Sequence, residues 1–204
     1  MEHKKLVIIL FIFTIILQLP LTTFSKEKAV QFSAVGDILL DRGIRMIIEK
    51  KGQDYPVKEI GFYLLSQDLV LGNLEGPLSE QGEAVMKKYK FRGDPSYIAV
   101  LKKAGINIIS LANNHIMDYS NLALIDTIVL LKNAGLYPLG AGKNQEEALK
   151  PFIINKNGLT LSFFASLGYP LQIEEVDPKA SGPCQVGLDE FISALQDIRD
   201  QVDF

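Results

Sequence analysis

The chain has 204 residues, of which 48% are hydrophobic and 22% are charged, and its formal net charge is −3 at pH 7. This length is enough for one α/β domain with a substantial core and an N-terminal extension. The slight acidity provides no broad basic field, which argues against a nucleic-acid partner. A single cysteine, Cys184, excludes an intrachain disulfide framework, and we expect it to be a partly buried loop thiol.

The first 25 residues are typical of an export signal. Residues 1–5 give a positively charged start, and residues 6–21 are almost wholly apolar. As a helix this run would span roughly 24 Å, less than the roughly 30 Å hydrocarbon core of a bilayer. Cleavage near Ser25 and retention as a signal anchor both stay open. We therefore expect an exported protein, secreted or held at the outer face of the cytoplasmic membrane, with its working domain at 26–204.

Strand and helix patterns alternate along that domain. The helical patterns end at Gly52, Gly105 and Gly135, and the polar stretch 80–90 is expected to be an exposed loop. We expect strands at 30–35, 68–71, 107–111 and 136–139, helices at 44–51, 55–66, 95–104 and 121–134, a hairpin of 152–154 with 159–164, and a last helix at 188–202. This order predicts an α/β fold with a mixed, mostly parallel sheet, and no strand follows the last helix, so we expect a sheet that is incomplete at its C-terminal end.

Three of the expected strands end in polar side chains. The first ends in Asp37, the second in Asn73 and Glu75, and the third in the segment Asn113 to Asp118, which contains Asn114 and His115. The carboxyl ends of parallel strands meet at one edge of a sheet, where such folds place their sites. Taken singly, Asp37 fits a helix cap, Glu75 an exposed side chain and His115 a structural histidine. Their spacing of 38 and 39 residues, from Asp37 to Glu75 to Asn114, suits successive strand-helix units and favours a common site.

With these motifs the chain resembles the bacterial capsule-synthesis (CapA) or poly-gamma-glutamate synthesis family, whose domain is similar to calcineurin-like metallophosphoesterases. The resemblance covers roughly residues 30 to 200 and implies a layered α/β sandwich. It rests on the segments VGDILLDR at 35–42, GNLEGPL at 72–78, KFR at 90–92 and residues 104–119, and it continues at 126–127, 140–144 and 147–151.

The resemblance implies a site with divalent metal ions, Mn, Fe or Zn, and possibly two of them. It makes Asp37 a metal ligand, places Glu75 where the superfamily has a bridging carboxylate, and makes Asn114 a ligand of the second ion. His115 would contact the scissile phosphate or leaving group, and Asp118 would orient it.

We expect substrate contacts from Arg42, Arg92, Asn73 and Asn113, although either arginine also fits a surface salt bridge. The chain departs from the superfamily pattern at Leu39, where a histidine is usual, and at Ser120, where glycine is usual. The later His-Trp-Gly and Gly-His-x-His elements are absent from the 204 residues.

Three functions remain open on this basis. The first is an exported, metal-dependent phosphoester hydrolase of capsule or poly-gamma-glutamate synthesis. The second is a non-catalytic, membrane-associated component that holds an anionic capsule polymer or contacts capsule synthase membrane subunits. The third is an inactive, truncated fragment with an exposed sheet edge.

Overall fold

The computed structural model describes residues 28–168 and 179–204, so the expected export signal at 1–25 lies outside the described residues. None of the described helices is long and apolar enough to cross a membrane. The elements in chain order are β1 (Phe32–Ile38), α2 (Arg42–Lys51), α3 (Gly61–Leu64), β2 (Leu69–Leu74), η1 (Pro95–Tyr97), α4 (Ile98–Lys103), β3 (Ile108–Ser110), α5 (Ser120–Asn133), β4 (Tyr137–Leu139), β5 (Ala141–Gly142), α6 (Gln145–Leu149), β6 (Phe152–Lys156), β7 (Leu159–Phe163), β8 (Gly182–Pro183), α7 (Leu188–Ile198) and η2 (Arg199–Gln201).

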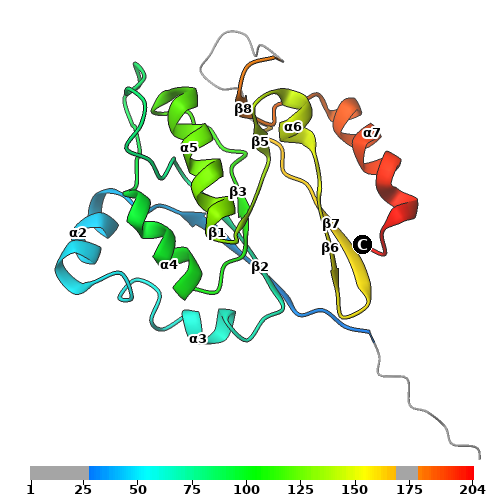
Figure 1. The fold of residues 1–204 in the computed structure, drawn as a ribbon, viewed down its shortest axis with the longest axis horizontal. Helices are drawn as coiled ribbons and strands as arrows, with labels where there is room; N and C mark the ends of the chain where they lie inside the picture. Colours follow the sequence, from blue (N-terminus) through cyan, green and yellow to red (C-terminus); the bar gives the residue numbers. More distant parts are fainter. Residues whose placement is uncertain (1–27, 169–178) are drawn as a thin grey trace, which may run out of the picture.

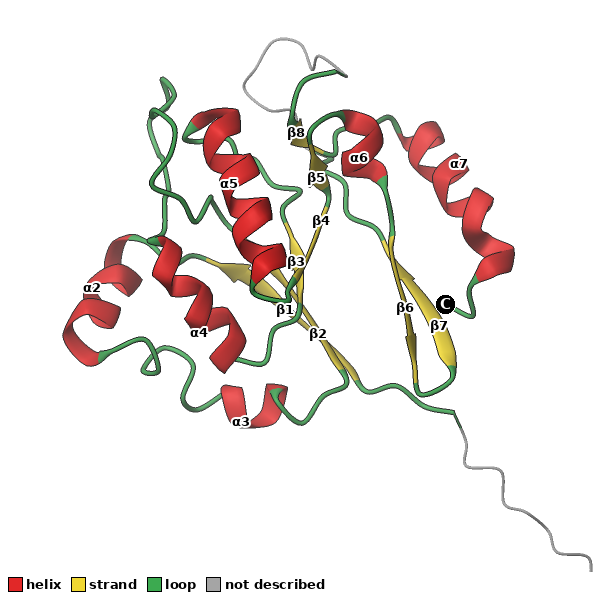
Figure 2. Cartoon of the chain, in the orientation of Figure 1, coloured by secondary structure: helices red, strands yellow, loops and turns green. Residues whose placement is uncertain are grey.

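A four-stranded parallel sheet forms the centre of the molecule, in the order β1-β2-β3-β4. The helices that connect these strands, α2 to α5, lie on one face of the sheet, and the β6–β7 hairpin and α7 lie on the other (Figures 1 and 2). The α/β class and the mostly parallel sheet are confirmed. The antiparallel strands form two separate pairs, β5 with β8 and β6 with β7.

The core divides along the two faces of this sheet. Successive side chains of a strand point to opposite faces, so Val70 and Ile109 pack under the helices, whereas Leu69 and Ile108 pack under the hairpin. All four side chains are at most 2% exposed. Because β2 and β3 are covered on both faces, their carboxyl ends are held at fixed positions.

The structure differs from the expected elements in two places. The predicted helix at 55–66 is wrong, since only Gly61–Leu64 is helical and the preceding residues form isolated turns. Gly61, in the middle of the predicted span, weakens helix formation there. The short helix α6 was not expected, although Asn144 caps it by accepting a hydrogen bond from the Glu147 N–H at 2.7 Å. This Asn-x-x-Glu spacing is a helix-start signal that the sequence already contained.

Candidate functional site

The polar side chains predicted at three strand ends meet at the carboxyl edge of the sheet. A β-bulge between Ala34 and Asp37 shifts the register of β1, and it places Asp37 opposite Asn73 of β2. The Asn73 side-chain amide donates to Asp37 Oδ1 at 2.7 Å. In turn, the amide of Asn113 donates to Asn73 Oδ1 at 3.1 Å. Hydrogen bonds between side chains therefore join the ends of β1 and β2 to the loop after β3.

Asn113 fixes the loop that carries the histidine. Its side chain is 7% exposed, donates to the Leu74 carbonyl at 2.9 Å, and accepts a hydrogen bond from the His115 N–H at 3.0 Å. Through these contacts Asn113 links the end of β2 to the loop of His115, and its side chain does not face outward. Asn114 points differently, because it is exposed while its carbonyl accepts a hydrogen bond from Lys87 at 2.7 Å.

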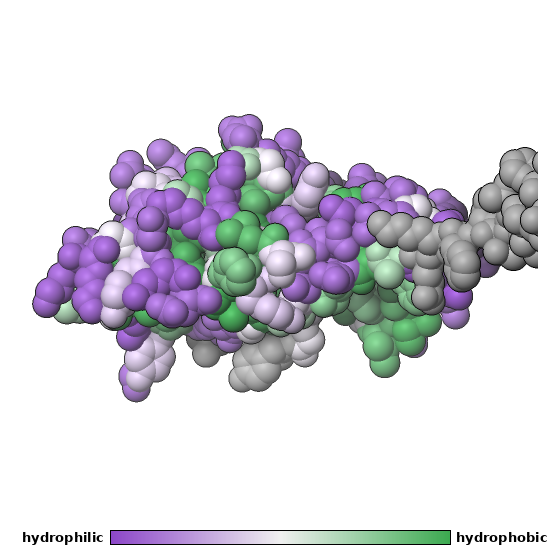
Figure 3. Space-filling model, turned by 90° about the horizontal axis from the view of Figure 1, so that it is seen from below, coloured by the Kyte–Doolittle hydropathy of each residue, from purple (hydrophilic) through white to green (hydrophobic). Residues whose placement is uncertain are grey.

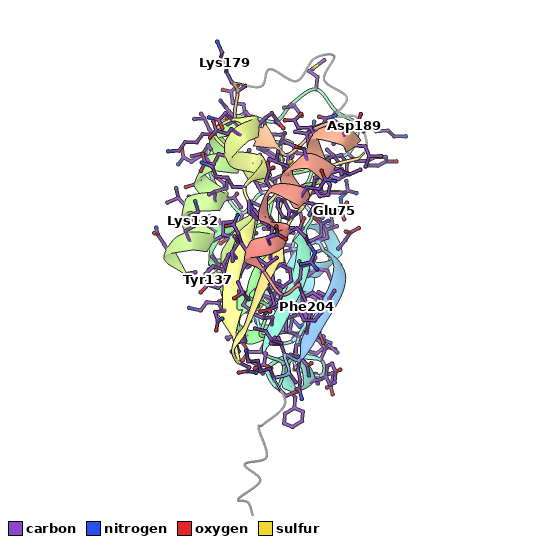
Figure 4. All side chains as sticks on the ribbon, turned by 90° about the vertical axis from the view of Figure 1, so that its right-hand side faces the viewer. Glu75, Lys132, Tyr137, Lys179, Asp189 and Phe204 are labelled. Carbon is purple, nitrogen blue, oxygen red and sulfur yellow. The ribbon has the colours of Figure 1, made fainter. Side chains whose placement is uncertain are left out.

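His115 and Asp118 form a buried pair. His115 Nδ1 lies 2.7 Å from Asp118 Oδ2, and the same oxygen accepts a hydrogen bond from the Phe91 N–H at 2.9 Å. In a neutral imidazole whose Nδ1–H donates to the Asp118 carboxylate, Nε2 carries the lone pair. Nε2 lies 3.7 Å from Glu75 Oε1 (Figure 4 labels Glu75). The Phe91 ring packs on the imidazole with ring centroids 4.1 Å apart, which further fixes the plane of His115.

Lys87 is a member of this cluster that sequence reasoning missed. It lies in the stretch 80–90, which was expected to be an exposed loop, but its side chain is only 15% exposed. Its ammonium group donates to Asp118 Oδ1 at 2.9 Å and lies 3.4 Å from His115 Nδ1. The Lys87 ammonium can only donate, so it and His115 Nδ1–H both donate to the Asp118 carboxylate that lies between them. The charge pattern of 80–90 gives no sign that one of its several lysines points inward.

Glu75 lies in an electrostatically unfavourable position. Its side chain is 22% exposed, and burial is the main cause that raises the pKa of its carboxyl group, followed by direct interaction with Asp37. Asp118 raises it further, and His115 opposes these effects. Two adjacent carboxylates favour either a shared proton or a bound cation.

The two predicted substrate-binding arginines lie on aromatic rings around this site. The Arg42 guanidinium lies 4.7 Å from the centroid of Phe91 and 5.5 Å from that of Tyr89, and Arg92 lies 3.9 Å from that of Tyr119. Phe91 also contacts His115, so Arg42 is one ring away from the imidazole. Neither arginine is tied to a carboxylate by a salt bridge within the described residues. Both can therefore receive an anion.

The donor set suits part of a divalent-cation site. Among residues 28–168 and 179–204, no three His, Cys, Asp or Glu side chains are grouped closely enough to hold a metal ion by themselves. What the site does offer is the paired carboxylates of Asp37 and Glu75, with side-chain amide oxygens close by. Such oxygen ligands suit Mg or Mn better than Zn, which prefers nitrogen and sulfur ligands. Ions of the first kind keep several waters, so two carboxylates fit as part of their coordination shell.

Comparison with known proteins gives this site its context. The chain is 30% identical over 148 residues to the capsule biosynthesis protein CapA of Bacillus anthracis. The matched residues are 71% of this chain and 35% of that protein. The chain is 29% identical over 147 residues to the PGA biosynthesis protein CapA of Bacillus subtilis, covering 71% and 38%. It is also 37% identical over 76 residues to a probable polyglutamine synthesis accessory protein of Mycobacterium tuberculosis, covering 37% and 20%.

The chain thus spans little more than a third of the length of the two CapA proteins. Residues 31–190 match the sequence profile described as bacterial capsule synthesis protein PGA_cap, and this range contains every residue of the candidate site. The chain therefore belongs to the bacterial capsule synthesis protein family PGA_cap.

Proposed function

We propose that this chain is an exported capsule or poly-gamma-glutamate biosynthesis protein whose site hydrolyses a phosphoester with the help of a divalent cation. The observation that carries the proposal is the paired carboxylates of Asp37 and Glu75 beside a histidine held by Asp118. The carboxylate pair can bind a cation, and the histidine can transfer a proton. The names of the related proteins support the place of this chemistry in capsule synthesis.

Asp37 and Glu75 are the residues that would hold the cation, with Asn114 as a further oxygen donor from its exposed position. When bound, a divalent cation polarises a phosphoryl oxygen and lowers the pKa of a bound water. Asn73 restrains Asp37 through the 2.7 Å hydrogen bond, so the carboxylate needs little reorganisation to bind. This restraint favours binding because less side-chain freedom is lost.

His115 supplies the proton transfer. Its Nδ1–H is committed to Asp118, so Nε2 is the nitrogen free to accept or donate a proton at a substrate oxygen. The Lys87 ammonium and the Phe91 N–H hold the Asp118 carboxylate in place through hydrogen bonds. Arg42 and Arg92 at the rim attract the anionic substrate.

The test measures cation binding and hydrolysis on the same samples. Isothermal titration with Mn²⁺, Mg²⁺ and Zn²⁺ should show binding to the wild-type chain and none to Asp37→Ala. With p-nitrophenyl phosphate and a bis-ester as probes, both Asp37→Ala and His115→Ala should lose hydrolysis, whereas an exposed control, Asp54→Ala, should keep it. Unchanged turnover in both site variants would overturn the assignment.

A second function is favoured by the incomplete cation site, because the described residues alone do not supply three His, Cys, Asp or Glu ligands. In this case the chain holds an anionic capsule polymer or contacts synthase membrane subunits without turnover. It predicts co-purification with such subunits, and polymer binding that depends on Arg42 and Arg92. Normal surface polymer after deletion of the gene would count against a capsule role of either kind.

A further inference from the structure

The end of the molecule opposite the candidate site carries large apolar side chains in water. In the segment around α3, Ile60 is 49% exposed, Phe62 87%, Tyr63 57% and Leu65 62%. Scattered apolar side chains are normal on a protein surface, but a contiguous group marks an interaction site. Ile60 also lines a cavity together with Asp37, so we call the other three residues, Phe62, Tyr63 and Leu65, the basal patch.

The packing of α3 explains why its large side chains face outward. The helix buries Gly61 and Leu64. A Cβ atom at Gly61 would lie 3.1 Å from the Lys103 carbonyl, so the chain approaches the end of α4 closely at this point. Because glycine and one leucine fill the inner side, the remaining large side chains have only the outer side available. The patch is therefore fixed by the fold and is not a frayed helix end.

The basal patch lies at the same end of the molecule as the start of the described chain (Figure 1). The backbone N–H groups of Asp68 and Leu69, just after α3, donate to the Gln31 carbonyl at 2.9 and 3.1 Å. This end holds the amino ends of β1 and β2, whereas the candidate site lies at their carboxyl ends. Only residues 22–27 separate Lys28 from the apolar run 6–21, and six residues reach at most about 20 Å.

Lysines, most of them paired with a carboxylate, occur in the elements next to the basal patch. Lys58 precedes α3, Lys102 and Lys103 end α4, and Lys156 precedes the turn of the β6–β7 hairpin. The side chains of Lys58, Lys103 and Lys156 are 54%, 48% and 38% exposed, and each also contacts a carboxylate. Figure 3 looks onto this end and shows hydrophobic surface near its centre, bordered by hydrophilic surface. Exposed aromatic and aliphatic groups with lysines in the neighbouring elements suit the headgroup region of a bilayer, where lysine side chains can contact lipid phosphates.

We propose that the basal patch rests on an anionic lipid bilayer, with Phe62 and Leu65 entering the headgroup region and the lysines contacting lipid phosphates. Retention of residues 6–21 as a membrane anchor places this end within reach of the lipid. The candidate site at the carboxyl ends of the strands then faces away from the membrane. The proposal does not depend on whether the site is catalytic.

The absence of tryptophan from all 204 residues provides a clean test. Phe62→Trp introduces the only tryptophan of the chain at a side chain that is 87% exposed, so the core is undisturbed. The control is Leu122→Trp, at a position that is 61% exposed in the first turn of α5, directly after the site loop. Both full-length variants are reconstituted in vesicles of phosphatidylcholine and phosphatidylglycerol with brominated or unbrominated acyl chains.

The Phe62→Trp emission should shift to the blue and be quenched by brominated lipid, while the Leu122→Trp emission should do neither. Lys102→Glu with Lys103→Glu, added to Phe62→Trp, should weaken the quenching. Equal, unquenched emission from the two tryptophans would overturn the proposal. A blue shift that grows with protein concentration in the absence of lipid would also overturn it, because it would assign the patch to a second copy of the chain.

Discussion

Asp118 holds the histidine side of the candidate site together, so its replacement by asparagine tests the arrangement. Asp118 is fully buried and accepts hydrogen bonds from Lys87, from the Phe91 N–H and from His115. Asparagine keeps the shape but removes the charge and turns an NH₂ group toward these donors. Hydrogen bonds to charged groups contribute about 1.5–3 kcal/mol each, and breaking a buried ion pair costs about 3–5 kcal/mol. Because Lys87 keeps 15% exposure and can be partly hydrated, we expect a loss near the lower end, about 3 kcal/mol.

For a chain of this size, a loss of that order lowers the melting temperature by about 6–12 °C. Thermal unfolding followed by circular dichroism, together with urea unfolding, measures the change. The matched control is Asp54→Asn, which removes a carboxylate that is 72% exposed and pairs with Lys103, and which should barely change the melting temperature. If Asp118→Asn melts with the wild-type protein, Asp118 does not hold an ion pair, and the argument for a fixed His115 tautomer fails.

Three further variants test neighbouring parts of the site. Burial and Asp37 raise the pKa of Glu75 above its ordinary value of 4.5, so its stabilising contribution is present below that value and is lost as pH rises through the raised pKa. In metal-free buffer, Glu75→Gln should therefore become more stable than the wild-type protein toward neutral pH, as measured by urea unfolding. With Mn²⁺ present, the wild-type protein should be the more stable of the two. Lys87→Met should leave the Nδ1–H tautomer of His115 in place, because the Asp118 carboxylate that accepts this hydrogen bond remains; imidazole ¹⁵N shifts in a His3→Gln background, where His115 is the single histidine, should match those of the unsubstituted Lys87, and mixed tautomers would contradict the role given to Asp118. Ser120 has a φ of 70°, so Ser120→Gly should raise the urea midpoint by relieving up to about 1 kcal/mol of backbone strain.

The sequence predicts the parallel strands and the meeting of their polar ends well, because both follow from local patterns. Apolar runs that alternate with helical patterns define β1 to β4, and the carboxyl ends of parallel strands necessarily share an edge. The prediction therefore placed Asp37, Asn73, Glu75 and the loop of His115 at one edge without any knowledge of their side-chain contacts. The roles assigned to these residues stay predictions until cation binding and hydrolysis are measured.

What the sequence could not predict depends on tertiary contacts. Lys87 is one of several lysines in a polar stretch, and only the position of Asp118, 31 residues later, turns it inward. The loop is held by contacts with no sequence signal: the Val85 N–H donates to the Asp118 carbonyl at 3.0 Å, and a Cβ atom at Gly82 would lie 1.9 Å from the Tyr119 carbonyl. The bulge that aligns Asp37 with Asn73 likewise arises from strand pairing.

The charges in the site separate the two functions that we consider. Asp118 is neutralised by Lys87, whereas Asp37 and Glu75 raise each other's energy when both are ionised. A carboxylate-rich or phosphate-rich polymer would be repelled by this pair unless a cation lay between them. A binding role without a cation must therefore use the rim at Arg42 and Arg92, and it predicts affinity that is unchanged by EDTA and lost in Arg42→Ala with Arg92→Ala. The catalytic role predicts that EDTA weakens the binding of the polymer. One titration of a poly-anion with and without chelator therefore distinguishes the two roles.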